Sequence, residues 1–329
     1  MQPGGAAPQA QASGSVLTMT QTQEDRLQEL TDKLENGIKE LFASGRYAEY
    51  LAAMSKFHHY SFGNVVLIML QCPTATHVAG YNRWKKNFGR QVKKGEHGIS
   101  ILCPCPQTRW MQKQKTDAVT GQPVISPDGS PVMETVRVTI PRFKIGTVFD
   151  VSQTEGRELP SIVTAELTGE VDCFRELFDC LVSLSPVPVT EGEVPGAAKG
   201  FFSSEEQRIV LRRGMPQLQV IKTLVHEIAH ARLHDRTKLP VEEQKERSQK
   251  EVEAESIAYV VCQYLGLDTS DYSFGYVAGW SRNKELREMK ESLGVIQSTA
   301  GEMISKIEAS LGRNQEPEPV APRVQLQQR

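Results

Sequence analysis

The strongest chemical signal in the chain is a five-residue segment from His226 to His230 that reads His-Glu-Ile-Ala-His. Residues four apart lie on the same face of a helix, so the two imidazoles can reach one Zn²⁺. Glu227 lies between them and can take a proton from a water molecule and deliver it to a leaving group. The spacing therefore predicts His226 and His230 as metal ligands and Glu227 as the catalytic base. The alternative is an ordinary helix that carries two structural histidines.

A third ligand is needed to hold zinc while one coordination position stays open. The segment after the motif offers Glu251, Glu253 and Glu255. On a helix, Glu253 falls within the apolar stripe that continues through Ile257 and Val260, whereas the other two glutamates fall on the opposite side. A buried carboxylate is costly unless it is paired or bound to a metal. Glu253 is therefore the predicted third ligand, with Glu251 and Glu255 as the alternatives.

Other polar groups near the motif have roles that the sequence leaves open. His234 repeats the four-residue step beyond His230, which suits either a group behind the metal ligands or a histidine at a helix end. Three tyrosines could stabilise negative charge that develops on a substrate: Tyr259, Tyr264 and Tyr276.

The motif needs a helix that a core holds firmly. Ile221, Leu224, Val225 and Ile228 form one apolar face at helical spacing, so a helix is predicted over residues 216–234. Other patterns in this half predict a loop at 186–200, a strand at 208–211, a helix at 242–265 and a helix at 284–311. In the first half they predict helices at 27–42, 46–57 and 61–71, and β-type runs at 99–103 and 135–151.

A second cluster combines positive charge with aromatic rings. Residues 81–115 contain nine Lys and Arg against one Glu, in a chain whose 38 Lys+Arg and 40 Asp+Glu give a net charge of −2. Basic groups neutralise phosphates and aromatic rings stack on unpaired bases, which suits single-stranded nucleic acid. The candidate contacts are Trp84, Lys85, Lys86, Arg90, Lys93 and Lys94. The alternative is a solvated charged face with Trp84 in a core.

Composition sets the scale of the fold. Hydrophobic residues make up 39% of the 329, enough for a core, so disorder throughout is excluded. The predicted class is α+β with two domains, over residues 24–155 and 156–312, between disordered tails at 1–23 and 313–329. The longest apolar run, Val65 to Leu70, is too short to cross a membrane. With neither a secretory signal nor a disulfide framework, a cytoplasmic protein without membrane partners is expected.

Several motifs in the first half resemble the N-terminal domain of ArdC-type antirestriction proteins. They are Tyr60–Asn64, Thr76–Tyr81, Trp84–Lys86 and Gly89–Glu96, and Val148–Thr154 resembles the end of that domain. The resemblance implies that this domain binds single-stranded DNA.

The second half is similar to the zincin-like metallopeptidase domains that are often fused to that domain on mobile genetic elements. Leu224–Ala231 and Glu251–Glu255 carry this similarity. In the more distant ImmA/IrrE-type peptidases the site ends with a Glu-Ala step, which here matches Glu253-Ala254. Residues 208–211 stand where zincin-type peptidases have the edge strand that binds an extended substrate.

Together the two resemblances imply a metalloendopeptidase of the gluzincin type with Zn²⁺, or alternatively Mn²⁺, as its ion. Its partners would be single-stranded DNA and a protein substrate. The implied role is protection of incoming single-stranded DNA during conjugation, by cleaving or displacing host proteins. One alternative is a non-catalytic DNA-binding shield with a structural or vestigial metal site. Another is an ImmA-like peptidase that cuts a repressor.

Overall fold

The computed structural model describes residues 21–117, 121–159, 171–267, 269–270, 272, 274, 277–282 and 284–311. The helices in these ranges are α1 (Gln21–Ala43), α2 (Tyr47–Lys56), α3 (Phe62–Gln71), α4 (Tyr81–Lys86), α5 (Val171–Leu184), α6 (Gln217–Leu233), α7 (Arg247–Tyr264), α8 (Val277–Ser281) and α9 (Leu286–Ser310), with short 3₁₀ turns η1 (Val151–Gln153) and η2 (Val241–Glu243). The strands are β1 (Val78–Gly80), β2 (Arg90–Val92), β3 (Ile99–Pro104), β4 (Gln107–Gln114), β5 (Met133–Ile140), β6 (Phe143–Asp150), β7 (Thr154–Gly156), β8 (Val189–Gly192), β9 (Gly200–Ser203) and β10 (Arg208–Arg212). Helices with small, mostly antiparallel sheets make an α+β fold, as predicted.

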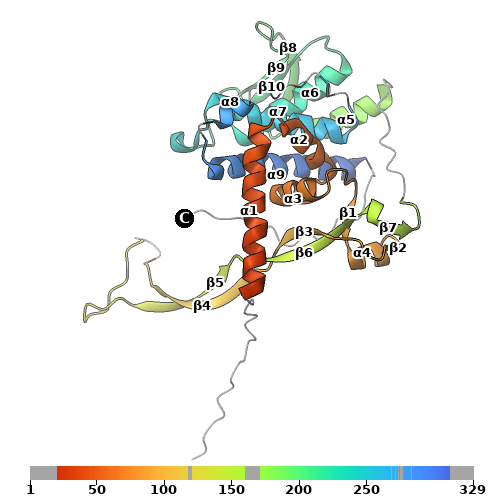
Figure 1. Cartoon of the computed structure of the whole chain (residues 1–329). Coiled ribbons are helices and arrows are strands. Elements are labelled where there is room, and N and C mark those ends of the chain that lie inside the picture. Colours follow the sequence, from red (N-terminus) through yellow and green to blue (C-terminus); the bar gives the residue numbers. More distant parts are fainter. Residues whose placement is uncertain are drawn as a thin grey trace, which may run out of the picture.

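Helices from both halves of the chain share one core. In Figure 1, α1 crosses α9, while α2 and α3 lie against the same helical layer. The buried Tyr47 of α2 places its hydroxyl 3.0 Å from Oγ of Ser256 in α7. Apolar side chains of α1, α2 and α3 belong to the same buried cluster as those of α6, α7 and α9. The boundary near residue 155 stays a prediction, since residues 160–170 lie outside the described ranges.

The helical layer is joined to the first sheet through side-chain amides of α3. This sheet has the order β1-β6-β3, so one edge of β3 has no strand beside it. The amide of Asn64 donates to the carbonyl of Leu102 (3.0 Å) and accepts from its N–H (2.9 Å). Gln71 makes the same pair of bonds with Ser100. Asn64 and Gln71 lie on the same face of α3, about two turns apart. Their amides thus satisfy the backbone groups at the edge of β3 as a neighbouring strand would, because buried backbone groups require partners.

Strands β4 and β5 form an antiparallel hairpin that projects from the body (Figure 1). Trp110 in this hairpin is 71% exposed. The run predicted over 135–151 is two strands, β5 and β6, which are separated by Pro141 and Arg142. Proline lacks the N–H that a continuous ladder requires, which explains the break.

The sheet of the second half has the order β8-β10-β9. The prediction that residues 208–211 form an edge strand is wrong, because β10 pairs with β8 on one side and β9 on the other. Its three central residues are all buried, as expected of a strand with neighbours on both sides. The edge strands are β8, which lies inside the predicted loop at 186–200, and β9.

The other predicted helices and strands occur within a few residues of their expected bounds. α1 begins at Gln21, inside the predicted N-terminal tail, and the rest of that tail and the C-terminal tail at 313–329 lie outside the described residues. Among the residues that the structure describes, no helix combines the length and apolar character needed to cross a membrane.

Candidate metal centre

The histidine motif lies on α6, whose apolar face is anchored in the core. Ile221, Leu224, Val225 and Ile228 are 2% exposed or less. α6 packs against β9 and β10 on one side and against α7 on the other. The backbone that carries the two histidines is therefore held from both sides.

Three ligand atoms from α6 and α7 converge in this region. Nε2 of His226 lies 3.0 Å from Nε2 of His230. Oε2 of Glu251 lies 3.6 Å from the first nitrogen and 3.7 Å from the second. Zinc binds N and O ligands at about 2.0–2.2 Å, so tetrahedral ligand atoms around it are roughly 3.4 Å apart. The triangle formed by these atoms has the size that one such ion requires.

The carboxylate beside the two motif histidines is that of Glu251, and the assignment of Glu253 as third ligand is corrected accordingly. Glu253 is fully buried, as its place in the apolar stripe predicted. Its burial is offset by other groups: Lys245 donates to both oxygens at 2.7 and 2.8 Å, and Ser292 donates at 2.8 Å. The helical wheel identified which glutamate is buried, but it could not show which face of α7 meets α6.

A directional set of hydrogen bonds connects Glu253 to the motif. Its Oε2 lies 3.0 Å from Nε2 of His234, and Nδ1 of His234 lies 3.0 Å from Nδ1 of His230. A carboxylate only accepts, so Nε2 of His234 donates, and Nδ1 of a neutral His234 accepts from His230. Burial lowers the pKa of His234, which favours this neutral ring. Nε2 of His230 then carries no proton, and its lone pair faces His226 and Glu251.

The same logic applies to His226. Its Nδ1 lies 3.7 Å from Oε2 of Glu255, which favours a proton on that nitrogen and a lone pair on Nε2. Burial by itself lowers the pKa of His226, but the hydrogen bond to Glu251 and the charges of the nearby glutamates raise it overall. The two Nε2 atoms, 3.0 Å apart, therefore share either a proton or a metal ion. The donor set of two imidazoles and a carboxylate therefore fits a divalent metal ion.

Glu227, the predicted catalytic base, lies close enough to His226 and His230 for their charges to affect its pKa. It is 7% exposed, and it accepts a hydrogen bond from the backbone N–H of Phe202 in the edge strand β9. Burial raises the pKa of Glu227, although the nearby His226 and His230 partly oppose this effect. A carboxylate with a raised pKa beside a metal site is a suitable general base near neutral pH.

Two of the three candidate tyrosines, Tyr259 and Tyr264, contact other groups of the fold. Tyr264 donates its hydroxyl to Oε1 of Glu308 at 2.7 Å. The ring of Tyr259 packs edge-on against Tyr272 and Phe274. Tyr276 lies outside the described residues. The observed contacts of Tyr264 and Tyr259 are thus with other groups of the fold.

The basic segment divides into buried and exposed residues. The prediction that Trp84 contacts nucleic acid is wrong, because its side chain is 1% exposed and its Nε1 donates to the carbonyl of Phe149 at 2.9 Å. The ring belongs to a small core with Ala79 and Val92, so it cannot stack on a base. The alternative prediction, that Trp84 lies in a core, is confirmed.

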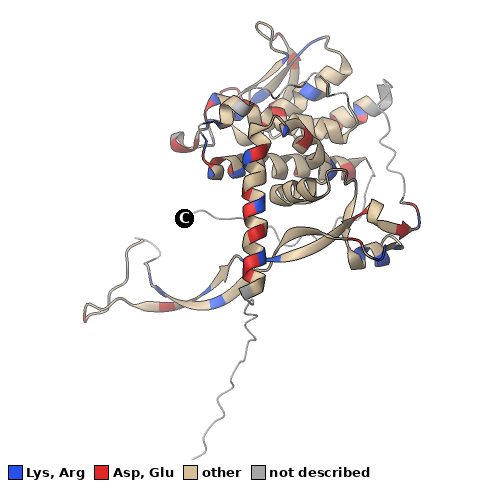
Figure 2. Ribbon diagram, viewed as in Figure 1, with Lys and Arg blue, Asp and Glu red and all other residues tan. Residues whose placement is uncertain are grey.

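The basic residues named with Trp84 differ in their contacts. Arg90 donates to Oγ1 of Thr154 at 2.7 Å and to backbone carbonyls of the same region, so its guanidinium holds β2 to β7. Lys93 donates to the carbonyl of Ser152 at 2.9 Å. Lys85, Lys86 and Lys94 have exposed side chains. Figure 2 shows the ribbon of α4 coloured for Lys and Arg at this end of the molecule.

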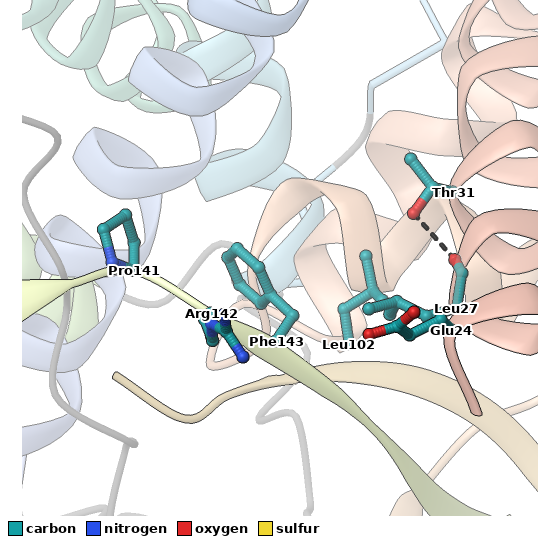
Figure 3. Close-up of a pocket in the computed structure, with 7 residues that line it drawn as sticks. All are labelled: Glu24, Leu27, Thr31, Leu102, Pro141, Arg142 and Phe143. Atoms are coloured by element: carbon teal, nitrogen blue, oxygen red, sulfur yellow. Dashed lines mark hydrogen bonds between the residues drawn. The ribbon is translucent and has the colours of Figure 1, made fainter. Parts of the chain in front are cut away.

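A separate cavity of about 320 Å³ lies at the base of the β4–β5 hairpin. Figure 3 shows Glu24 and Thr31 of α1 on one side of it and Phe143 of β6 on the other. None of the motif residues lines this cavity, so it is not part of the candidate metal centre.

Comparisons with known proteins agree with the first-half motifs. Residues 20–149 match the family described as the N-terminal domain of anti-restriction factor ArdC. The chain is 25% identical over 325 residues to the uncharacterized protein pXO2-81 of Bacillus anthracis, covering 88% of this chain and 53% of that protein. It is 38% identical over 81 residues to DNA primase TraC of Escherichia coli, covering 24% of this chain and 7% of TraC. The chain thus spans about half the length of the first relative.

Two solved structures are similar in outline. They are the metal-free and Mn(II)-bound forms of the antirestriction protein ArdC from plasmid R388, with 20% and 19% identity and TM-scores of 0.44 and 0.43. Each alignment covers 77% of this chain and 85% of the other. The family match thus relates residues 20–149 to the N-terminal domain of ArdC.

Proposed function

We propose that this protein is a metal-dependent endopeptidase that acts while bound to single-stranded DNA, and that it protects incoming DNA from restriction by removing host proteins. The observation that carries the proposal is the convergence of His226, His230 and Glu251 beside the buried Glu227. The ligands assigned to the metal are Nε2 of both histidines and Oε2 of Glu251.

The chemistry follows from what these residues can do. A divalent ion in this site would act as a Lewis acid and lower the pKa of a water molecule. Glu227 is the group that takes the proton of the attacking water and later gives it to the leaving amine. The backbone N–H of Phe202 holds Glu227 in place through its hydrogen bond. Zn²⁺ suits two imidazoles and a carboxylate best, with Mn²⁺ as the alternative.

Strand β9 is proposed to bind the protein substrate. It is an edge strand, and it carries Phe202, the residue that contacts Glu227. An extended peptide that adds to this edge would satisfy its free backbone groups by β-augmentation. The scissile bond of such a peptide would lie near the catalytic base.

The DNA-binding part of the proposal is supported by the family match of residues 20–149 and by the exposed lysines of α4 and the turn after β2. Lys85, Lys86 and Lys94 are the proposed phosphate contacts, with a further contribution from Lys93. The exposed aromatic residues nearest to them in the chain are Tyr81 (49% exposed) and Trp110 (71% exposed). These rings, in place of Trp84, are proposed to stack on unpaired bases.

The test is restriction of incoming DNA in cells that express the full chain or a variant. Glu227→Gln keeps the size and hydrogen bonding of the side chain but removes the base, so protection is expected to fall to the level of cells without the protein. Glu205→Gln, an exposed substitution on the β9–β10 turn, is the matched control and should protect fully.

Either of two results would overturn the proposal of a DNA-bound peptidase. If Glu227→Gln protects as well as the unmodified chain while binding single-stranded DNA equally, the protein acts as a shield. If variants that no longer bind single-stranded DNA protect as well as the unmodified chain, while Glu227→Gln does not, cleavage of a repressor independent of DNA becomes the better account. Gel-shift measurement with a single-stranded oligonucleotide distinguishes these cases.

A further inference from the structure

A second group of side chains that could hold a metal ion lies outside the motif. His58 and His59 follow α2, and Glu308 belongs to the last turn of α9. One ligand atom from each of the three lies within 4.8 Å of the others. His58 and Glu308 are each 8% exposed, so this is an interior cluster.

The contacts of His58 determine which of its nitrogens carries the proton. Nδ1 lies 3.2 Å from the carbonyl oxygen of Ser55. A carbonyl only accepts, so Nδ1 is the donor. When the ring is neutral, Nε2 therefore carries a lone pair and no proton. Metal-binding histidines characteristically donate their other nitrogen to a backbone carbonyl or carboxylate in this way.

Nε2 of His58 is buried and has no hydrogen-bond partner among the described residues. It faces Oε1 of Glu308 at 3.6 Å, which is longer than an N–H···O bond. The same distance separates Nε2 of His226 from Oε2 of Glu251 in the candidate metal centre. A lone pair and a carboxylate oxygen that face each other inside a protein repel, and either a proton or a metal ion between them removes this repulsion.

The surrounding fold holds these groups in place. Gln297 of α9 donates to the backbone carbonyl of His58 at 2.8 Å. Gly301, one turn further along α9, lets that carbonyl approach closely, because a Cβ there would lie 2.9 Å from it. Tyr264 at the end of α7 donates to Oε1 of Glu308 at 2.7 Å. The cluster thus joins the segment between α2 and α3 to α7 and α9.

The charge balance permits one divalent ion. The cluster contains one carboxylate, that of Glu308, which offsets part of the charge of a divalent ion. Two imidazoles and one carboxylate match the ligand preference of zinc and similar transition metals.

We propose that His58, His59 and Glu308 bind a second divalent transition-metal ion, and that this ion is structural. Its ligands come from residues 250 positions apart in the chain, so it would clip the first half of the chain to the last helix. Such a site contributes its binding free energy to folding, because the unfolded chain has no preformed site. The proposal does not depend on peptidase activity.

Zinc content of the full-length chain is the first test, measured by mass spectrometry after loading with zinc and gel filtration. We expect two ions per chain in the unmodified protein and one in His226→Ala/His230→Ala. His58→Asn/Glu308→Gln should also keep one, and the combination of all four substitutions none. The proposal is overturned if the unmodified chain holds one ion and His226→Ala/His230→Ala holds none. The pair of His58 and Glu308 would then be a buried ion pair.

A second measurement leaves the new cluster unchanged, in case its variants do not fold. The metal-free His226→Ala/His230→Ala chain is titrated with Co²⁺, whose visible absorption reports nitrogen and oxygen ligands. A band that saturates at one equivalent, and a melting temperature that rises with added Zn²⁺, are expected. The rise should be absent when Glu308→Gln is added. A titration without a band and without a shift in melting temperature would exclude the site.

Discussion

Oε2 of Glu253 lies 3.0 Å from Nε2 of His234, in a position where the carboxylate is fully buried. This contact gives a role to a glutamate that is not part of the group formed by His226, His230 and Glu251. Through His234 it fixes the proton of His230 on Nδ1 and leaves Nε2 free for a metal ion. Three glutamates on α7 are thus divided between direct contact with the ligand triangle and support of the ligands behind it.

Glu251→Gln is expected to remove the third ligand and weaken metal binding, since a neutral amide is a poorer ligand than a carboxylate. Glu255→Gln is the comparison on the same helix: it removes only the carboxylate that faces Nδ1 of His226 at 3.7 Å, so it should weaken metal binding less than Glu251→Gln does. The measurement is zinc affinity by competition with a chromophoric chelator, in chains that also carry Glu308→Gln. Equal affinities in the two variants would contradict the assignment of Glu251.

His234→Ala should lower metal affinity by about 10- to 100-fold, the usual effect of losing a partner behind a metal-bound histidine. Its removal leaves Nδ1 of His230 without its acceptor and Glu253 without one of its donors. Glu246→Gln, an exposed substitution at the start of α7, is the control. If zinc affinity is unchanged and only the melting temperature falls, His234 stabilises the fold but does not support the metal ligand His230.

Lys85→Ala/Lys86→Ala is expected to weaken binding to a single-stranded oligonucleotide. For single strands each phosphate contact adds about 0.7 to the magnitude of the slope of log affinity against log salt. The magnitude of this slope should therefore be smaller by about 1.4 in the double variant. Lys33→Ala/Lys39→Ala, on the exposed side of α1, removes the same charge and should leave the slope unchanged. Equal slopes in both double variants would show that α4 does not contact the DNA.

Trp84→Leu tests the corrected role of this residue. Loss of the buried ring and of its bond to Phe149 is expected to destabilise the small core by roughly 2–5 kcal/mol. Affinity for the oligonucleotide, measured well below the melting temperature, should stay within twofold of the unmodified chain. A large loss of affinity in a variant with unchanged melting temperature would instead support direct contact.

Asp150→Asn tests the pH dependence of the first sheet. Burial by itself would raise the pKa of Asp150, but hydrogen bonds from Ser152, Thr76 and His77 outweigh it and lower the pKa below the ordinary 3.8. A lowered pKa in the folded state contributes stability above pH 3.8, and this contribution is lost as pH falls through the folded pKa. At pH 7 the free energy of unfolding of the unmodified chain should therefore be about 1–3 kcal/mol larger than that of the variant.

That difference in the free energy of unfolding should shrink below about pH 4, where Asp150 becomes protonated in the unfolded chain. Urea unfolding at a series of pH values measures it. Asp128→Asn, in an exposed turn, is the control and should show little difference at any pH. A difference for Asp150→Asn that is independent of pH would contradict the ionised hydrogen-bonded carboxylate.

The sequence by itself determined the features that depend on near neighbours. The spacing of His226 and His230 guarantees a shared face on α6, because helical periodicity relates residues four apart. The helices α1, α3, α6 and α9 were predictable for the same reason, since their apolar faces repeat along the chain. The burial of Glu253 also followed from periodicity.

Tertiary structure decided which groups meet across elements. The choice of Glu251 over Glu253 depends on how α7 is turned toward α6, which no periodicity within α7 specifies. Trp84 is buried because its ring and Nε1 meet a strand 65 residues further along the chain. The approach of His58 to Glu308 joins residues 250 positions apart. Such contacts result from the packing of whole helices and strands, so local pattern could not reveal them.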